Sequence, residues 1–510
     1  MFLLAALLKQ LSLLEKLLYK ISNMKFLFRI LFVIIVIICF VSCGKGSGGG
    51  QSPTPTPVPT PTPTPTPVVS EVAFWLTKSD GSVLLAKQNV ALNFSTASSQ
   101  SSTITVDSTI KYQTMDGFGY ALTGGSAQLI NGMSATNHNT LLKELFSTDS
   151  NAIGISYIRI SIGASDLSSS FFTYDEMPSG QTDLNLTNFN FDIDRLQLVP
   201  LLKEIIAINP SIKILGSPWT APSWMKTNKS GYGGKLDPVY YNVYADYLIK
   251  YIKAMKAEGI TIDAITPQNE PLNAFNNPSM EMTAIEQTDF IKNNIGTKFR
   301  AANITTKIII YDHNADHPDY PLTVLSDATA SQYVDGSAFH LYAGTISALS
   351  TVHNAYPNKN IYFTEQYTSS TGLFSGDLAW HFRNLIIGAP RNWSRNVIEW
   401  NLANDPNYNP HLTGGCTDCK GALTLNGDNI TRNVSYYIIA HASKFVPAGS
   451  VRVESNTTSN LQNVAYVTPA GKKVLIVLND SIASQAFNIS FNGKIVTVTL
   501  DAGSVGTFTW

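Results

Sequence analysis

The rhythm of hydrophobic and polar positions changes twice along the chain. Short stretches of strand character occupy residues 71–77, 82–87, 90–94 and 102–106, and similar stretches return at 451–455, 464–468, 473–478, 486–491 and 494–500. Alternation with period two is typical of strands, and Asn492-Gly493 is a hairpin turn signal. Neither set can bury two faces alone. We therefore expect both chain ends to build one β-sandwich.

Between these ends, apolar stretches of strand length alternate with helical patterns. The expected strands are 115–121, 155–160, 212–217, 262–267, 307–311, 336–342, 361–365 and 396–401. The clearest helical stripe runs from Tyr240 to Met255 at three- and four-residue intervals and stops before Gly259. Strands alternating with helices in this number predict a closed (β/α)8 TIM barrel, an α/β fold. An open doubly wound sheet is the alternative, but no glycine-rich phosphate loop stands at its expected place.

The charge balance of the 510-residue chain narrows the classes of partner. There are 35 basic and 36 acidic residues, for a net charge of -1. Nucleic-acid-binding domains usually carry a clustered basic excess. We therefore expect no nucleic-acid partner.

Residues 24–43 resemble a bacterial lipoprotein signal. Lys25 and Arg29 precede a short apolar stretch that ends at Cys43. The resemblance implies that Cys43 is lipidated and becomes the mature N-terminus, with Met24 as the start. An uncleaved membrane anchor is the alternative. Both place the body outside the cytoplasm, anchored to a membrane at the cell surface or in the periplasm.

A Gly-rich and Pro/Thr-rich linker follows the signal. Proline at every second position from Pro53 to Pro67 favours extended polyproline II, about 45 Å long. The predicted organisation is therefore signal, linker, N-terminal sandwich strands, catalytic barrel and C-terminal sandwich, at 1–43, 44–68, 69–110, 111–445 and 446–510.

Two glutamates end predicted barrel strands. Glu270 follows the fourth strand, in Gln268-Asn269-Glu270-Pro271, and Glu365 ends the seventh. The C-terminal strand ends of a barrel build its active site. Two carboxyl groups there can hydrolyse a glycoside, one as a protonated acid and one as an ionised nucleophile, if their surroundings push their pKa values apart.

The order of several motifs resembles glycoside hydrolase family 30, which includes glucosylceramidases and endo-β-1,6-glucanases. The motifs are Asp116-Gly117-Phe118-Gly119-Tyr120, Tyr157-Ile158-Arg159-Ile160, Ala164-Ser165-Asp166, Pro218-Trp219-Thr220-Ala221-Pro222-Ser223-Trp224-Met225-Lys226, Gln268-Asn269-Glu270-Pro271, His340-Leu341-Tyr342, Thr364-Glu365 and Glu399-Trp400-Asn401-Leu402. The resemblance covers the chain from Tyr112 to the C-terminus. It implies a barrel with a sandwich built from both chain ends.

The resemblance also implies roles for single residues. Glu270 would be the acid/base and Glu365 the nucleophile of a retaining hydrolase, with Asn269 bonded to the sugar 2-hydroxyl. The sugar site would be lined by Arg159, Asp166, Trp219, Tyr342 and Trp400. His340 is either a donor behind the site or a core histidine. Trp224 is interpreted as a core residue, and Asp312-His313-Asn314 as a segment bordering the cleft.

The loop motifs favour one branch of this family. Thr123-Gly124-Gly125-Ser126 departs from the Thr-Asp-Ala-Ala of glucosylceramidases. The segments 120–124, 268–273 and 414–421 are more similar to the β-1,6-glucanases. We therefore expect a β-glucan substrate, with glucosylceramide hydrolysis and non-catalytic glycan binding as alternatives.

Cys416 and Cys419 are the two cysteines of the predicted body. A zinc site normally takes four ligands, and the sequence offers no second pair. Outside the cytoplasm a disulfide in this loop is expected instead. No ligand cluster in the sequence requires a metal or another cofactor.

Overall fold

The computed structural model describes residues 69–97, 100, 102–149 and 151–510. The predicted signal, Cys43 and the linker lie outside the described residues. Among the residues that are described, no helix is both long and apolar enough to cross a membrane.

Eight parallel strands form the barrel that the sequence predicts. They are β4 (Gly117–Ala121), β5 (Tyr157–Ser161), β6 (Lys213–Ser217), β7 (Ala264–Ile265), β8 (Lys307–Ala315), β9 (Val334–Gly344), β10 (Asn360–Glu365) and β12 (Asn396–Asn401). Neighbours in sequence are neighbours in the sheet, and β12 pairs with β4. Between β10 and β12, Arg395 N donates to Ile361 O at 2.9 Å and Trp400 N to Gln366 O at 2.8 Å. The eight strands therefore close into a ring, and the open doubly wound sheet is excluded.

Helices follow the strands along the barrel. They are α2 (Gly124–Asn131), α3 (Ala135–Phe146), α4 (Asp192–Ile208), η1 (Ser223–Met225), η2 (Pro238–Tyr240), α5 (Tyr241–Ala257), α6 (Ala284–Phe290), η3 (Ile291–Ile295), α7 (Gly296–Ala301), α8 (Asp319–Ser326), α9 (Ala328–Ser331), α10 (Ala348–Ala355), α11 (Phe374–His381), η4 (Phe382–Gly388), α12 (Ala389–Arg391) and α13 (Val434–Ser443). The predicted stripe of α5 is buried against the sheet, including Tyr244, Leu248 and Met255. Segments η3 and η4 are π-helical and interrupt otherwise continuous helices.

Inward-pointing side chains fill the barrel below its mouth. They come from seven of the strands: Tyr157, Leu215, Ala264, Ile309, Ala338, Tyr362 and Ile398. A barrel interior packed in this way is a core and not a channel. The polar residues at the C-terminal strand ends therefore lie above an apolar floor.

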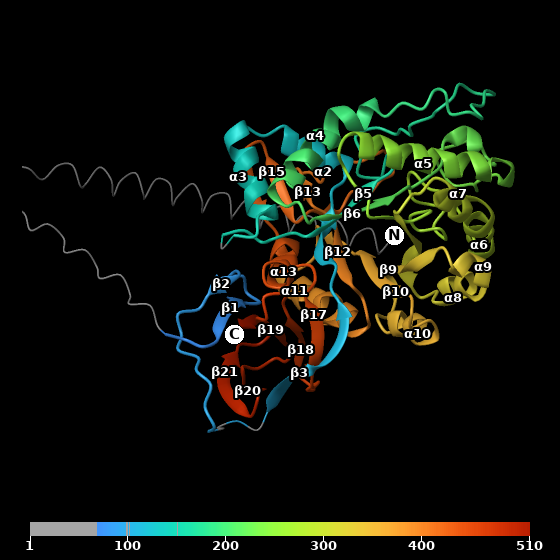
Figure 1. The fold of residues 1–510 in the computed structure, drawn as a ribbon. Helices are drawn as coiled ribbons and strands as arrows, with labels where there is room; N and C mark the ends of the chain where they lie inside the picture. The colour runs from blue at the N-terminus through green and yellow to red at the C-terminus, as the bar shows by residue number, and fades with distance from the viewer. Residues whose placement is uncertain (1–68, 98–99, 101, 150) are drawn as a thin grey trace, which may run out of the picture. The chain divides into compact units, whose positions relative to one another are not determined.

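The chain ends meet in one nine-stranded sheet with the order β2-β1-β22-β19-β18-β17-β3-β20-β21. Its strands are β1 (Ala73–Thr77), β2 (Ala86–Lys87), β3 (Thr103–Thr114), β17 (Val451–Ser455), β18 (Leu461–Val467), β19 (Lys473–Asn479), β20 (Gln485–Phe491), β21 (Lys494–Leu500) and β22 (Val505–Thr509). Figure 1 shows the blue N-terminal strands beside the red C-terminal ones. The first part of β3 pairs with β20 and the rest with β17, so this strand joins the two halves of the sandwich.

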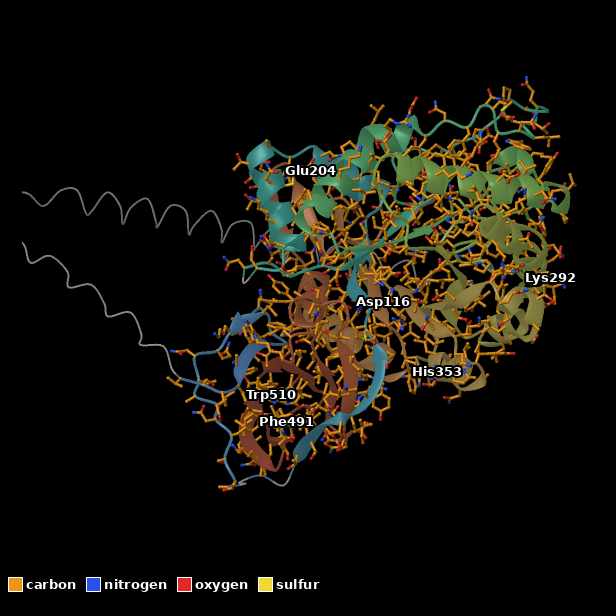
Figure 2. All side chains as sticks on the ribbon, viewed as in Figure 1. Asp116, Glu204, Lys292, His353, Phe491 and Trp510 are labelled. Atoms are coloured by element: carbon orange, nitrogen blue, oxygen red, sulfur yellow. A yellow bond between two sulfur atoms is a disulfide. The ribbon has the colours of Figure 1, made fainter. Side chains whose placement is uncertain are left out.

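Several details of the sandwich differ from the sequence prediction. Of the stretch 82–87, only Ala86–Lys87 forms a strand. The stretch 90–94 forms no strand, and its Leu92 O accepts one ladder-like hydrogen bond, from Val72 N at 3.0 Å. Strand β22 was not expected, because Gly506 interrupts a short apolar run. Phe491 and Trp510, labelled in Figure 2, pack with ring centroids 5.5 Å apart at one end of this unit.

The sandwich shares its packing with the barrel helices. Val464, Ile476 and Val505 belong to the large apolar cluster formed by side chains of the barrel strands and the helices packed on them. The ring of His441, on α13, bonds Thr77 Oγ1 and Thr507 Oγ1, each at 2.8 Å. Arg383 and Asp480 form an ion pair across the same boundary. Smaller pairings, β11 (Thr368–Ser369) with β14 (Cys419–Lys420) and β13 (Ala403–Asn404) with β15 (Leu423–Asn426) and β16 (Asn429–Arg432), order the loops at the mouth.

Candidate active site

Glu270 and Glu365 face each other at the C-terminal end of the barrel. Glu365 is the last residue of β10, and Glu270 stands five residues beyond the end of β7. One carboxylate oxygen of each lies within 4.8 Å of the other. Both side chains are less than a tenth exposed. Retaining glycosidases hold their two carboxyl groups about 5–5.5 Å apart, whereas inverting enzymes need about 6.5–9.5 Å.

Arg159 lies beneath the pair on β5 and is fully buried. Its Nη1 donates to Glu365 Oε2 at 2.6 Å, and its Nη2 donates to Asn269 Oδ1 at 2.6 Å and to Asp312 Oδ2 at 2.8 Å. Tyr342 OH donates to the other oxygen of Glu365 at 2.9 Å. Both oxygens of Glu365 therefore accept hydrogen bonds, the arrangement that favours an ionised carboxylate.

His340 contacts Glu270 and is not an isolated core histidine. Its Nδ1 lies 3.2 Å from Glu270 Oε1 and 3.7 Å from Glu365 Oε1, and its Nε2 lies 3.2 Å from Asp312 Oδ1. Of the two readings of this residue, a donor behind the site fits these contacts. The imidazole lies among three carboxyl groups.

Asp312 is a central residue that sequence reasoning placed only at the border of the cleft. It is fully buried, bonds Arg159 and His340, and accepts hydrogen bonds from Ser217, Thr266 and Thr364. Burial raises the pKa of Asp312, but the charges and hydrogen bonds around it, with Arg159 the strongest of them, hold this pKa well below its ordinary value. The sequence contained one signal of this role: Asp312 directly follows the apolar run of β8, as Glu270 follows β7.

In the free site the protons are not distributed as one protonated glutamic acid and one ionised glutamate. Burial raises the pKa of Glu270, but His340, with smaller contributions from His313 and Asn273, lowers it to about 2. Burial would lower the pKa of His340, yet the charges of Glu365 and the other carboxylates raise it to about 9. Burial also raises the pKa of Glu365, against the opposing charges of His340 and Arg159. The acidic proton of the Glu270–His340 pair therefore resides on the imidazole when no substrate is bound.

The backbone at Glu270 is left-handed, with φ of 46°. A non-glycine residue in this region costs about 1–3 kcal/mol and is frequent at active sites. Glu270 N donates to Asp312 O at 3.0 Å, and Asn273 Nδ2 donates to Glu270 Oε2 at 2.8 Å. The conformation is thus held from both sides of the loop.

Two tryptophans form an apolar wall beside the carboxyl groups. The rings of Trp219 and Trp400 lie 5.4 Å apart, and the Arg159 guanidinium lies 4.8 Å from the Trp219 ring. Trp219 Nε1 and Asp166 Oδ1 are buried without a hydrogen-bond partner among the described residues. Burial and the nearby Glu365 raise the pKa of Asp166 to about 7. Unsatisfied polar atoms beside an apolar wall suit a ligand that carries hydroxyl groups.

Trp224 takes no part in this wall. Its Nε1 donates to Asp175 O at 2.8 Å, and its ring packs on Tyr240. The interpretation of Trp224 as a core residue fits these contacts.

Cys416 and Cys419 are joined by a disulfide in the loop after β12. Cys419 packs in the same small cluster as Trp219 and Trp400. In this loop, Leu412 N donates to Asp166 O at 2.8 Å. The disulfide loop therefore supports the wall of the site.

Two groups within the described ranges bring three potential metal ligands together. In Cys416, Asp418 and Cys419 both sulfur atoms are consumed by the disulfide. In Glu270, His340 and Glu365 the oxygens already accept hydrogen bonds from Arg159, Tyr342 and Asn273. The contacts among Glu270, His340 and Glu365 are therefore better suited to proton transfer than to holding a metal ion.

A barrel with paired carboxylates above an apolar floor and an aromatic wall defines a glycoside hydrolase. The family models match accordingly. The family 30 TIM-barrel domain matches residues 115–446 and the family 30 β-sandwich domain matches 449–508. The chain belongs to glycoside hydrolase family 30.

Several relatives are similar over most of the chain. An endo-1,6-β-D-glucanase of Neurospora crassa is 37% identical over 79% of this chain and 85% of that protein. The lysosomal acid glucosylceramidase of Mus musculus is 28% identical over 78% of this chain and 82% of that protein. A solved endo-β1,6-glucanase superimposes with a TM-score of 0.80 at 37% identity, covering 87% of this chain and 99% of that one.

Proposed function

We propose that this chain cleaves β-1,6-glucan with retention of anomeric configuration. This proposal rests on the placement of Glu270 and Glu365, because one carboxylate oxygen of Glu270 lies within 4.8 Å of one of Glu365. The choice of glucan is supported by the higher identity to endo-1,6-β-glucanases, 37%, than to a glucosylceramidase, 28%.

Glu365 is the proposed nucleophile. One carboxylate oxygen attacks the anomeric carbon, the glycosidic bond breaks, and its electron pair leaves with the departing oxygen. Arg159 and Tyr342 hold the two oxygens in place. These donors orient the carboxylate for attack while satisfying its buried charge.

Glu270 and His340 supply the proton in this proposal. In a 1,6-linkage the leaving group is a primary alcohol, which departs poorly unless it is protonated. The proton passes from His340 Nδ1 to Glu270 Oε1, 3.2 Å away, and then to the leaving oxygen. Glu270 next takes a proton from the water that hydrolyses the glycosyl-enzyme and returns it to His340 Nδ1, which restores the starting state.

Four further residues bind the sugar in this proposal. Asn269, whose Oδ1 accepts a hydrogen bond from Arg159, is proposed to bond the 2-hydroxyl, a contact that strengthens in the transition state. Asp166 Oδ1 and Trp219 Nε1 offer an acceptor and a donor to other hydroxyls. Trp400 provides an apolar face.

The test compares product release from β-1,6-glucan, β-xylan and glucosylceramide. We expect rapid release of gluco-oligosaccharides from β-1,6-glucan, and a loss of about a thousandfold or more for Glu365→Gln, which keeps the side-chain volume. Turnover of glucosylceramide alone would assign the lipid substrate instead. Binding of glucan without any release would indicate a non-catalytic glycan-binding protein.

A further inference from the structure

Asn273 holds Glu270 on the side opposite His340. Its Nδ2 donates to Glu270 Oε2 at 2.8 Å, and its backbone N donates to Glu270 O at 2.8 Å. Its own Oδ1 accepts from Phe275 N at 3.1 Å. The side-chain amide nitrogen, the side-chain oxygen and the backbone N–H of Asn273 are thus all bonded within the loop that carries Glu270.

The two oxygens of Glu270 have different neighbours. Oε1 faces His340 Nδ1, and Oε2 faces the amide of Asn273. An amide N–H donates to a lone pair and cannot accept a proton from the acid. While this bond exists, Oε2 is an acceptor, and Oε1 is the oxygen that can receive the proton of His340 Nδ1.

We propose that Asn273 is a positioning residue that selects Oε1 of Glu270 as the proton-donating oxygen and tunes its acidity. This inference rests on the proposed function, since it concerns the acid of that reaction. Among the hydrogen bonds of the described residues, those of Asn273 go to Glu270 and Phe275 and none goes to Glu365, Trp219 or Trp400. Its effect should therefore be confined to protonation of the leaving group.

The charged and titratable groups around Glu270 come from several strands and loops. They are Arg159 on β5, Asp166 after β5, Asp312 and His313 on β8, His340 and Tyr342 on β9, and Glu365 on β10. Removing Asn273 leaves all of them in place. The Asn273 hydrogen bond favours the ionised form of Glu270 and so lowers its pKa. Its loss should raise the affinity of Glu270 for a proton.

The test uses Asn273→Ala and Asn273→Asp in the whole protein, with two substrates. β-1,6-Glucan has a poor leaving group, whereas a 2,4-dinitrophenyl β-gentiobioside has a good one that needs no acid. For Asn273→Ala we expect kcat/KM on glucan to fall about tenfold to a hundredfold, within the range that acid catalysis contributes. We expect kcat/KM on the dinitrophenyl substrate to change less than about threefold, since that step needs no proton.

The pH profile gives a second readout. The basic limb of kcat/KM on glucan should move to higher pH in Asn273→Ala, and further in Asn273→Asp, whose carboxylate faces Oε2. Asn276→Ala is the control, because the Asn276 side chain bonds only the neighbouring Asn277 N among the described contacts. It should match the wild type, and melting temperatures show that each variant folds.

Equal losses on both substrates, or an unmoved basic limb, would overturn the positioning role. An Asn273→Ala variant that behaves as Asn276→Ala does would overturn it as well. A failure of the proposed function can be distinguished from a failure of the Asn273 proposal, because the wild type itself would then release nothing from β-1,6-glucan.

Discussion

At the residue scale, His340 determines where the catalytic proton resides. Its imidazole lies 3.2 Å from Glu270 Oε1 and 3.2 Å from Asp312 Oδ1. The pair formed with Glu270 therefore holds one proton, and its titration belongs to both residues. Without a cation beside it, a buried Glu270 next to Glu365 would have a raised pKa and hold the proton itself.

This arrangement predicts the limbs of the pH profile. Activity needs Glu365 ionised, and its pKa is raised, so the acid limb of kcat/KM should lie above an ordinary glutamate at about 4.3. Activity also needs the proton of the Glu270–His340 pair, which is lost as pH rises through about 9. In His340→Gln the basic limb should fall by about one pH unit or more, because Glu270 alone binds its proton less tightly than the pair. A limb that stays near its wild-type position would exclude His340 from the proton path.

At the element scale, the loop after β12 supports the sugar wall. The Cys416–Cys419 disulfide closes a very short ring, and Cys419 packs on Trp219 and Trp400. In the chain-entropy model such a ring adds about 2 kcal/mol to the free energy of unfolding. Its greater effect should therefore be on the position of the loop.

Replacing both cysteines by serine tests this role. We expect KM for glucan to rise several-fold with a smaller change in kcat, because Glu365 lies on β10 and Glu270 on the loop after β7, outside the disulfide loop. Steady-state kinetics of the double variant and of the reduced wild-type protein should agree. A fall in kcat with KM unchanged would show that the loop acts on the chemistry and not on binding.

The sequence predicts well those elements whose pattern of apolar and polar residues lies within the element itself. The eight barrel strands, α5, and the two glutamates at strand ends are visible as apolar periods that end at polar residues. The polar segment 107–114 of β3 was missed, because its pairing with β17 is decided by a strand more than three hundred residues away. The role of Asp312 and the proton on His340 were also missed, since both depend on distances between strands that no local pattern contains.

At the scale of the whole molecule, barrel and sandwich are joined by a buried histidine. His441 lies on α13 and bonds Thr77 of β1 and Thr507 of β22. Burial lowers its pKa to about 3. The two regions should unfold together, because they share one apolar cluster.

The neutral state of His441 predicts acid sensitivity. Its folded pKa lies below the unfolded value of about 6.5, so its contribution is complete above pH 6.5 and is lost as pH falls toward 3. The loss amounts to about 1.4 kcal/mol per pH unit in this window. Denaturant unfolding of His441→Gln should show a weaker dependence on pH between 6.5 and 4 than the wild type. An unchanged dependence would assign the acid sensitivity to other groups.

The N-terminal region carries the prediction about location. We propose that Cys43 is lipidated and holds the body outside the cytoplasm at a membrane, on the basis of the sequence 24–43. Cys43→Ser should move the protein from the membrane fraction to the soluble fraction while its glucanase activity is kept. Retention of the variant in the membrane would favour the uncleaved anchor.

The anomeric configuration of the first product tests the central claim most directly. Proton NMR can follow the new reducing end during hydrolysis of β-1,6-glucan, before the anomers equilibrate. Double displacement at Glu365 with Glu270 as acid/base predicts that the β-anomer forms first and the α-anomer appears later by mutarotation. Initial release of the α-anomer would contradict the proposed mechanism, and absence of any product would contradict the proposed substrate.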